Sequence, residues 1–139
     1  MIGVPAGRSA SRSGFLDAIR LIKKDDVIEV RRELENGLDP NFSNEIGTTL
    51  LMLSAMEGKT SVGGLLIDRG ADIDRENSMR DTALSLSARH VHPRFVKLLL
   101  ERGASVEHIR RSGSFDSFLA LVEAHCGLTG EQLNQLRSA

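Results

Sequence analysis

Apolar residues recur at helical spacing from Phe15 onward, and glycine or polar residues interrupt them at regular intervals. In the first part of the chain this pattern predicts two helices, which the polar segment 23–26 separates. An aspartate of that segment can cap the second helix, and Gly37 suits the left-handed position that follows a helix. Residues 1–14 are rich in Gly, Ser and Arg and lack apolar periodicity, so we expect a flexible N-terminal tail there.

The segment 49–71 recurs 33 residues later as the segment 82–104, and the alignment needs no gap. The identical pairs are Thr49/Thr82, Leu51/Leu84, Leu53/Leu86, Ser54/Ser87, Ala55/Ala88, Leu65/Leu98, Leu66/Leu99, Arg69/Arg102, Gly70/Gly103 and Ala71/Ala104. Each copy predicts a short helix capped by its threonine, a second helix with a Leu-Leu pair, and a Gly-Ala turn. A fixed period of this length indicates stacked helical units, each of which buries its apolar face against its neighbours.

Gly63 and Gly64 lie inside the predicted second helix of the first copy, where glycine is unusual. Each glycine costs about 0.5–1 kcal/mol relative to alanine in a helix. The pair indicates either the close approach of a neighbouring helix or local weakness, and the sequence favours neither explanation.

The chain after the second copy departs from the pattern. Gly113 aligns with Gly47, and the segment 115–125 is predicted to form one helix. The segment 129–132 has the form of a capping box that opens a last helix, which we expect to end at Arg137. The polar residues of this last helix suit a terminal unit whose outer face contacts water.

These motifs resemble those of ankyrin repeats, whose units open with Gly, a variable residue and then Thr-Pro-Leu-His. The two copies carry this motif at 47–52 and 80–85, followed by Ser-Ala, Leu-Leu and Gly-Ala pairs. The resemblance covers residues 15–139 and implies an all-α solenoid of stacked helix-turn-helix units joined by hairpin-like loops. Four units are expected, at 15–43, 44–76, 77–109 and 110–139, of which the first and last are caps. Neither copy has the family's Pro or His, so the hydrogen bonds that this His makes between repeats are missing, and we expect a less rigid array.

The resemblance also implies a non-catalytic module that binds a partner protein through the concave groove and the hairpin tips, as an adaptor or as an inhibitor or immunity protein. The family's variable positions map to three tips, around 42–46, 75–79 and 108–112. Exposed apolar groups rimmed by charges are typical of interfaces. The candidate partner-binding residues are Phe42, Ile46, Met56, Arg75, Met79, Arg89, His90, Ile109 and Arg111. If these side chains instead fold back onto neighbouring tips, they contribute only to the scaffold.

The net charge of −1 provides no general attraction to nucleic acids or membranes. Between Arg75 and Arg111, however, eight Lys or Arg residues accompany four acidic residues, which favours a partner with an acidic or phosphorylated patch. An ordinary solvated helix surface is the competing interpretation. No aromatic platform accompanies this charge, so we do not expect nucleic acid as a partner. No segment approaches the roughly 18 apolar residues of a membrane span, and we expect a cytoplasmic protein that is monomeric when unbound.

Three residues carry the alternative of a metal-dependent or thiol enzyme, namely His90, His92 and Cys126. No Cys, Asp or Glu completes a familiar metal-ligand spacing around the two histidines. His125 is adjacent to Cys126 in sequence, which does not orient an imidazole and a thiol as a nucleophilic pair. The single cysteine excludes an internal disulfide, and we interpret it as a small buried apolar residue. We therefore expect no catalytic residue, no metal site and no cofactor.

Overall fold

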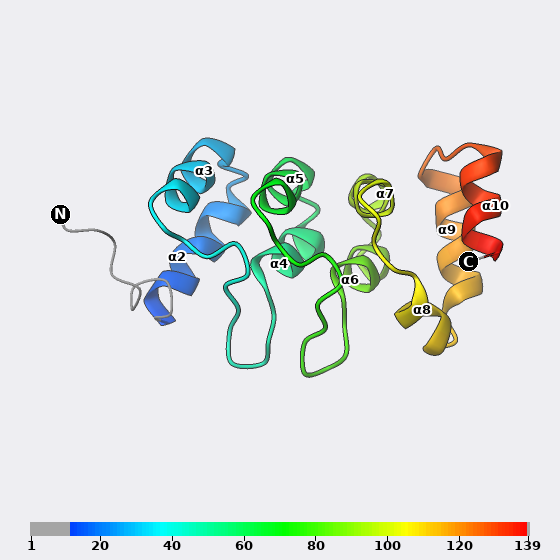
Figure 1. Ribbon diagram of the computed structural model, residues 1–139, viewed down its shortest axis with the longest axis horizontal. Helices are drawn as coiled ribbons and strands as arrows, with labels where there is room; N and C mark the ends of the chain where they lie inside the picture. Colours follow the sequence, from blue (N-terminus) through cyan, green and yellow to red (C-terminus); the bar gives the residue numbers. More distant parts are fainter. Residues whose placement is uncertain (1–11, 139) are drawn as a thin grey trace.

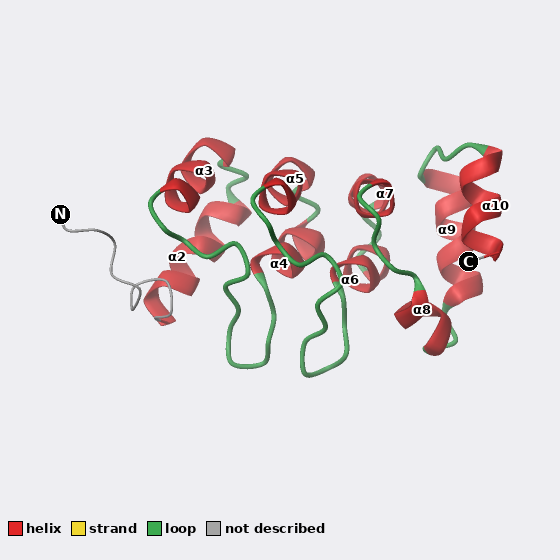
Figure 2. Ribbon diagram, viewed as in Figure 1, coloured by secondary structure: helices red, strands yellow, loops and turns green. Residues whose placement is uncertain are grey.

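The computed structural model describes residues 12–138, with side chains from residue 16 onward. The helices in this range are α2 (Arg12–Lys23), α3 (Val27–Glu35), α4 (Leu50–Glu57), α5 (Thr60–Asp68), α6 (Ala83–Arg89), α7 (Pro93–Glu101), α8 (Glu107–Arg111), α9 (Phe115–His125) and α10 (Gly130–Ser138). Across the same range Figure 2 shows helices and loops without a strand, and strand-like pairing is confined to an isolated bridge between Ser43 and Thr49. The predicted all-α fold is confirmed. The first helix begins at Arg12, before the expected boundary at Phe15, and residues 1–11 of the expected tail lie outside the described range.

Helices α2, α4 and α6 form one row, and α3, α5 and α7 form a second row beside it (Figure 1). Within each row successive helices contact one another, α2 with α4, α4 with α6, α3 with α5 and α5 with α7. The loops that precede α4 and α6 project as hairpins from the same side of the stack (Figure 1). The predicted solenoid of helix-turn-helix units is therefore confirmed, because units that are consecutive in sequence are neighbours in space.

Both threonine caps predicted from the repeat are present. The Oγ1 of Thr49 accepts a hydrogen bond from the backbone N–H of Met52 at 3.1 Å, and the Oγ1 of Thr82 accepts one from Ser85 at 3.1 Å. A reciprocal hydrogen bond is present in each case. The N–H of Thr49 donates to Met52 Sδ at 3.5 Å, and the N–H of Thr82 donates to Ser85 Oγ at 2.9 Å. Met52 and Ser85 occupy the position of the missing histidine, and they complete a reciprocal cap there.

Other polar side chains connect successive units. Asn41 Oδ1 accepts a hydrogen bond from the N–H of Asp72 at 2.7 Å, and Asn41 Nδ2 donates to the carbonyl of Gly70 at 3.1 Å. One period later, Asp74 Oδ1 accepts a hydrogen bond from the N–H of Ser105 at 2.8 Å. Polar links between units therefore exist without the histidine, because these side chains supply them, and the less rigid array stays a prediction.

The core consists mainly of aliphatic side chains. The largest fully buried hydrophobic ones are Phe95, Ile22, Leu50, Leu51, Met52, Leu66, Leu84, Leu99, Val62, Val96 and Val122. Phe95 packs against α5 at Gly63, where an added β-carbon would lie 2.5 Å from two of its ring carbons. At Gly64 the nearest atom, in Leu98, would be 3.9 Å away. The close approach of a neighbouring helix therefore explains Gly63, and it does not explain Gly64.

Two non-glycine residues of the third unit adopt left-handed backbone conformations that glycine adopts in the second unit. Arg80 has a φ of 64° at the position of Gly47, whose φ is 80°. Val91 has a φ of 56° at the position of Gly58, whose φ is 70°. A left-handed conformation costs an L-residue about 1–2 kcal/mol, and it is least suited to a β-branched residue. The third unit therefore carries strain at its hairpin tip and in the turn between α6 and α7.

The last unit departs from the regular stack. Helix α9 packs mainly against α7 and α8, and α9 and α10 run across the direction of the preceding helices (Figure 1). The predicted capping box is present, since Thr129 N–H donates to Gln132 Oε1 at 2.8 Å and Gln132 N–H donates to Thr129 Oγ1 at 3.2 Å. Arg110 lies 4.2 Å from the centre of the Phe115 ring and donates a hydrogen bond to the carbonyl of Leu136. These contacts attach α9 and α10 to α8.

Candidate functional site

One asparagine in each hairpin loop shapes its tip. The Oδ1 of this asparagine accepts hydrogen bonds from the backbone N–H groups two and four residues later. The distances are 3.1 and 2.9 Å at Asn44 and 2.9 and 3.0 Å at Asn77. Asparagine side chains that bond to nearby backbone groups stabilise turns. The two tips therefore have the same internal frame, one period apart.

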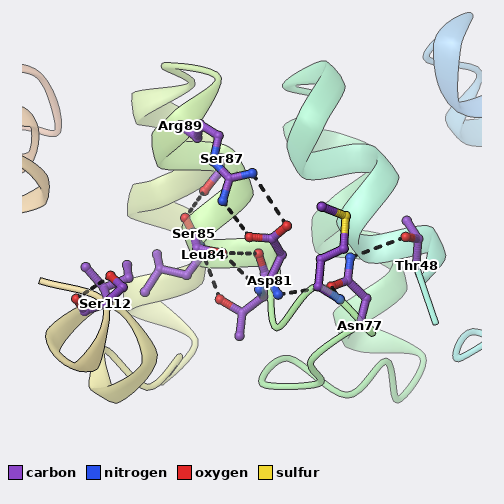
Figure 3. A network of polar contacts seen from close by, with 11 residues as sticks. Thr48, Asn77, Asp81, Leu84, Ser85, Ser87, Arg89 and Ser112 are labelled. Atoms are coloured by element: carbon purple, nitrogen blue, oxygen red, sulfur yellow. Dashed lines mark hydrogen bonds and ion pairs between the residues drawn. The ribbon is translucent and has the colours of Figure 1, made fainter. Parts of the chain in front are cut away.

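The two tips are also bonded to each other. The backbone N–H of Ser78 donates to the carbonyl of Ile46 at 2.8 Å. Figure 3 shows Asn77 reaching the neighbouring loop, where its Nδ2 donates to Thr48 Oγ1 at 3.4 Å. Asn77 and Thr48 are both buried, so water does not compete freely for this contact. The tips therefore present their outward side chains as one connected surface.

Ile46 and Met79 are the apolar side chains that this surface exposes. Ile46 is 47% exposed and Met79 is 71% exposed, each at the outer end of its loop. Their exposure agrees with the sequence prediction for both residues. Because each loop is held by its asparagine, the apolar side chains do not turn inward to join the core.

Phe42 and Ile109, which were expected to be exposed, are both buried. The carbonyl of Phe42 accepts a hydrogen bond from the N–H of Leu50 at 3.2 Å, which holds this segment against the start of α4. Ile109 lies on α8, and this helix turns Ile109 into the core and leaves Arg111 exposed. The expectation of a third exposed hairpin tip is wrong, because residues 107–111 are helical.

Arg89, at the end of α6, extends back to the carboxylate of Asp81, which precedes the same helix (Figure 3). Its Nη2 lies 2.5 Å from Oδ1 and its Nη1 lies 3.5 Å from Oδ2. The Asp81 side chain is only 9% exposed, whereas that of Arg89 is 59% exposed. Arg89 therefore compensates a buried carboxylate and keeps part of its guanidinium in contact with solvent.

Ion pairs in the folded protein neutralise part of the positive charge expected between Arg75 and Arg111. Ion pairs in addition to Arg89–Asp81 are Arg75–Asp72 at 3.8 Å, Arg80–Glu76 at 3.8 Å and Arg102–Asp68 at 2.7 Å. Two of these acids, Asp68 and Asp72, lie before the segment over which the charges were counted. The folded stack therefore supplies acids that a linear count leaves out. Arg94 and Arg111 are exposed and have no carboxylate partner within residues 16–138.

The two remaining candidates, Met56 and His90, lie at the ends of the first helices of their units. Met56 is half-buried, and a ring nitrogen of His92 lies 2.9 Å from its backbone carbonyl. His90 is exposed at the C-terminal end of α6. Met56 is therefore mainly part of the contact between two units, while His90 is available at the surface beside Arg89.

A cavity of about 380 Å³ lies between α6 and the α8–α9 segment. Its lining residues are Ser85, Ala88, Arg89, Val91, His108, Ile109, Ser112, Ser114, Ser117, Phe118 and Leu121. Sequence reasoning missed this cavity, because it depends on how α9 is placed rather than on any motif. The departure of the last unit from the 33-residue pattern is the signal that pointed to this region.

The residues of the alternative enzymatic function do not form a reactive group in the described structure. Cys126 is buried, its Sγ donates to the carbonyl of Pro93 at 3.4 Å, and burial raises the pKa of its thiol, with a smaller opposing effect of Lys97. His92 contacts the carbonyl of Met56. Within the part of the chain that the structure describes, no three His, Cys, Asp or Glu side chains gather as a metal site would require. Over the same residues, no helix has the length and apolar character needed to cross a membrane.

The comparison with protein families agrees with the geometry of the stack. A family model described as ankyrin repeats (3 copies) matches residues 9–110, which is more than half of the 139 residues. No curated protein is similar enough to the chain to count as a match. The match covers the two regular units and the hairpin tips, and it ends within α8, where the regular stack also ends.

Proposed function

The chain belongs to the ankyrin-repeat family, whose members are generally protein–protein interaction modules, and we propose that it binds a partner protein through its hairpin tips and the concave groove beside them. The observation that carries this proposal is the pair of exposed apolar side chains, Ile46 and Met79, on two tips that are bonded to each other. When a partner covers such exposed apolar groups, their removal from water stabilises the complex.

Charged side chains near these anchors would orient the partner. Arg75 lies in the loop that leads to the second tip, and Arg89 and His90 lie at the end of α6. Arg75 and Arg89 each have a carboxylate partner, yet both remain exposed to solvent. We propose that they favour an acidic patch on the partner, since charge complementarity at a rim raises association rates and selects among partners.

We propose a non-catalytic role, in which the chain either joins proteins as an adaptor or covers the active site of an enzyme as an inhibitor or immunity protein. Both roles need only a folded surface that a partner can cover, as the exposed hairpin tips offer. The adaptor role and the inhibitor role differ in their effect on the bound partner. An assay of the captured partner's enzymatic activity, with and without the chain, therefore decides between them. We also propose that the free chain is a monomer, which sedimentation analysis tests.

The binding surface is tested by charge substitution at the tips. An Ile46→Arg, Met79→Arg double variant is compared with wild type by affinity capture from a native lysate, read by mass spectrometry. The matched control is Ile28→Arg, because Ile28 is 75% exposed on α3, away from the hairpin tips. We expect the tip variant to lose at least about tenfold in affinity for a captured partner, and the control to lose little.

The helical circular dichroism of all three proteins should be the same, because the three substituted side chains are exposed to solvent. Equal capture by wild type and the tip variant would refute the proposed surface. Loss of binding in the Ile28→Arg control would place the interface on the α3 side of the stack instead.

A further inference from the structure

The position of α9 leaves space beside α6. In the regular units, the first helix of one unit packs against the first helix of the next, as α4 does against α6. In the last unit α9 packs mainly against α7 and α8. The result is the cavity of about 380 Å³, defined above, between α6 and the α8–α9 segment. Its volume lies at the lower end of the range of about 300–1,000 Å³ that is usual for ligand pockets.

The walls of this cavity combine an apolar interior with basic groups. Apolar side chains come from α6, α8 and α9 and from the turn after α6, and they include Val91, Phe118 and Leu121. The titratable lining residues are Arg89 and His108, and no acidic residue is among the lining residues. Arg111, which is exposed and without a carboxylate partner within residues 16–138, follows His108 by three residues on α8.

A second cavity, of about 320 Å³, shows that the basic lining residues occur on only one side of the last unit. It lies between the end of α7 and α10, and its titratable lining residues are Glu101 and Glu107. Two cavities of similar size therefore differ in their titratable lining residues, which are basic beside α6 and acidic beside α10. An acidic segment is repelled from the cavity beside α10 and meets no lining carboxylate in the cavity beside α6.

Val91 adds an independent observation at the mouth of the cavity beside α6. This residue is 62% exposed, and it is β-branched with a left-handed φ of 56°. The left-handed conformation itself belongs to this turn in each unit, since Asp25 and Gly58 hold φ values of 56° and 70° at the equivalent positions. Val91 differs from both because it is a β-branched apolar residue that is exposed to solvent. Strained residues of this kind occur preferentially at sites that bind ligands.

We propose that the cavity beside α6 is an anchor pocket for one apolar side chain of a partner protein, in a segment where an adjacent Asp or Glu pairs with His108, Arg111 and the exposed part of Arg89. This inference rests on the proposed function and specifies the partner's chemistry. The apolar side chain displaces water from Val91, Phe118 and Leu121. The adjacent carboxylate selects this cavity over the one with acidic walls.

The test uses a phage-displayed library of random peptides of about 12 residues, selected on the full chain. Enriched peptides should carry an aliphatic or aromatic residue within two positions of Asp or Glu. Their affinities are then measured for wild type, Ser117→Trp and Gln135→Trp. Ser117 is exposed on α9 and lines the basic cavity, whereas Gln135 is exposed on α10 and lines the acidic one. An indole at either place partly fills the respective cavity.

We expect Ser117→Trp to weaken peptide binding at least roughly tenfold, and Gln135→Trp to leave it unchanged within about twofold. A second variant, His108→Glu, tests the charge without filling the cavity, and it should weaken binding of the same peptides at least roughly tenfold. All three variants change side chains outside the buried core, and a thermal melt verifies that each is folded.

The proposal is overturned if no such peptide class is enriched, or if Ser117→Trp binds the peptides as wild type does. Enrichment of basic peptides, or a chain dimer blocked by Ser117→Trp, would also overturn it. The proposed function fails separately, if wild type and the Ile46→Arg, Met79→Arg variant capture partners equally. Loss of partner capture by that variant together with full peptide binding by Ser117→Trp would retain the protein-binding function and reject the pocket.

Discussion

A β-carbon at Gly63 would lie 2.5 Å from the Cε2 and Cζ atoms of Phe95, one unit further along the stack. Phe95 is fully buried, and α5 packs against α7 at this point. The glycine therefore allows a large aromatic ring to fill the contact between two units. Its helix-propensity cost is offset by the burial of that ring.

Gly63→Ala should destabilise the chain, because the Phe95 ring cannot move away without disturbing the core around it. We expect a loss of about 1–3 kcal/mol in the free energy of unfolding, as for other overpacked cores. Gly64→Ala is the matched control, since its β-carbon would meet only Leu98, at an ordinary contact distance of 3.9 Å. This substitution should stabilise the helix by about 0.5–1 kcal/mol. Urea unfolding of both variants tests the pair, and equal effects of the same sign would contradict the packing explanation.

Arg80→Gly should stabilise the chain, because Arg80 holds a left-handed φ of 64° at a position where Gly47 is found in the preceding unit. The gain expected is about 1 kcal/mol, from relief of the left-handed strain less the greater freedom that glycine adds to the unfolded chain. Arg80 is exposed, and the ion pair it would lose, with Glu76 at 3.8 Å, contributes little.

The opposite substitution checks the same position in the other tip. Gly47→Ala places a side chain at a φ of 80° and within 3.3 Å of the Asn77 backbone, so it should be destabilising. Thermal unfolding of the two variants gives the comparison. A lower melting temperature for Arg80→Gly would show that Arg80 makes a contribution to the fold that outweighs its strain.

Cys126 should make the stability of the fold depend on pH in the alkaline range. Burial raises the pKa of its thiol, and the nearby Lys97 opposes this effect less strongly. The folded state therefore favours the neutral thiol. Its contribution to stability is fully present below the ordinary thiol pKa of about 8.5 and is lost as the pH rises through the higher pKa of the folded state.

The measurement is the free energy of unfolding in urea at pH 7 and pH 10, for wild type and Cys126→Ala. The alanine variant will be less stable at both pH values because it leaves a small cavity, so the comparison is the change with pH rather than the absolute value. Wild type should lose more stability between the two pH values than the variant. The same pH dependence in both proteins would show that the buried thiol is not its source.

Local signals in the sequence determined the regular part of this protein. The 33-residue period placed the helices of the two central units, and Thr49 and Thr82 act as the predicted caps because capping depends on residues within one turn. The same holds for the Thr129–Gln132 capping box. The exposure of Ile46 and Met79 follows from the hairpin tips that the resemblance to ankyrin repeats implied.

The tertiary structure alone decided which side chains those elements cover. Phe42 and Ile109 are buried because of a backbone bond to the start of α4 and the formation of α8, and neither has a signal within its own segment. The reason for Gly63 lies in Phe95, 32 residues away, and the cavity beside α6 exists because α9 packs on α7. Helix caps and periodicity depend on residues that are close in sequence, whereas burial and cavities depend on how separate helices pack together. In the last unit α9 packs mainly against α7 and α8, which no local pattern in the sequence indicates.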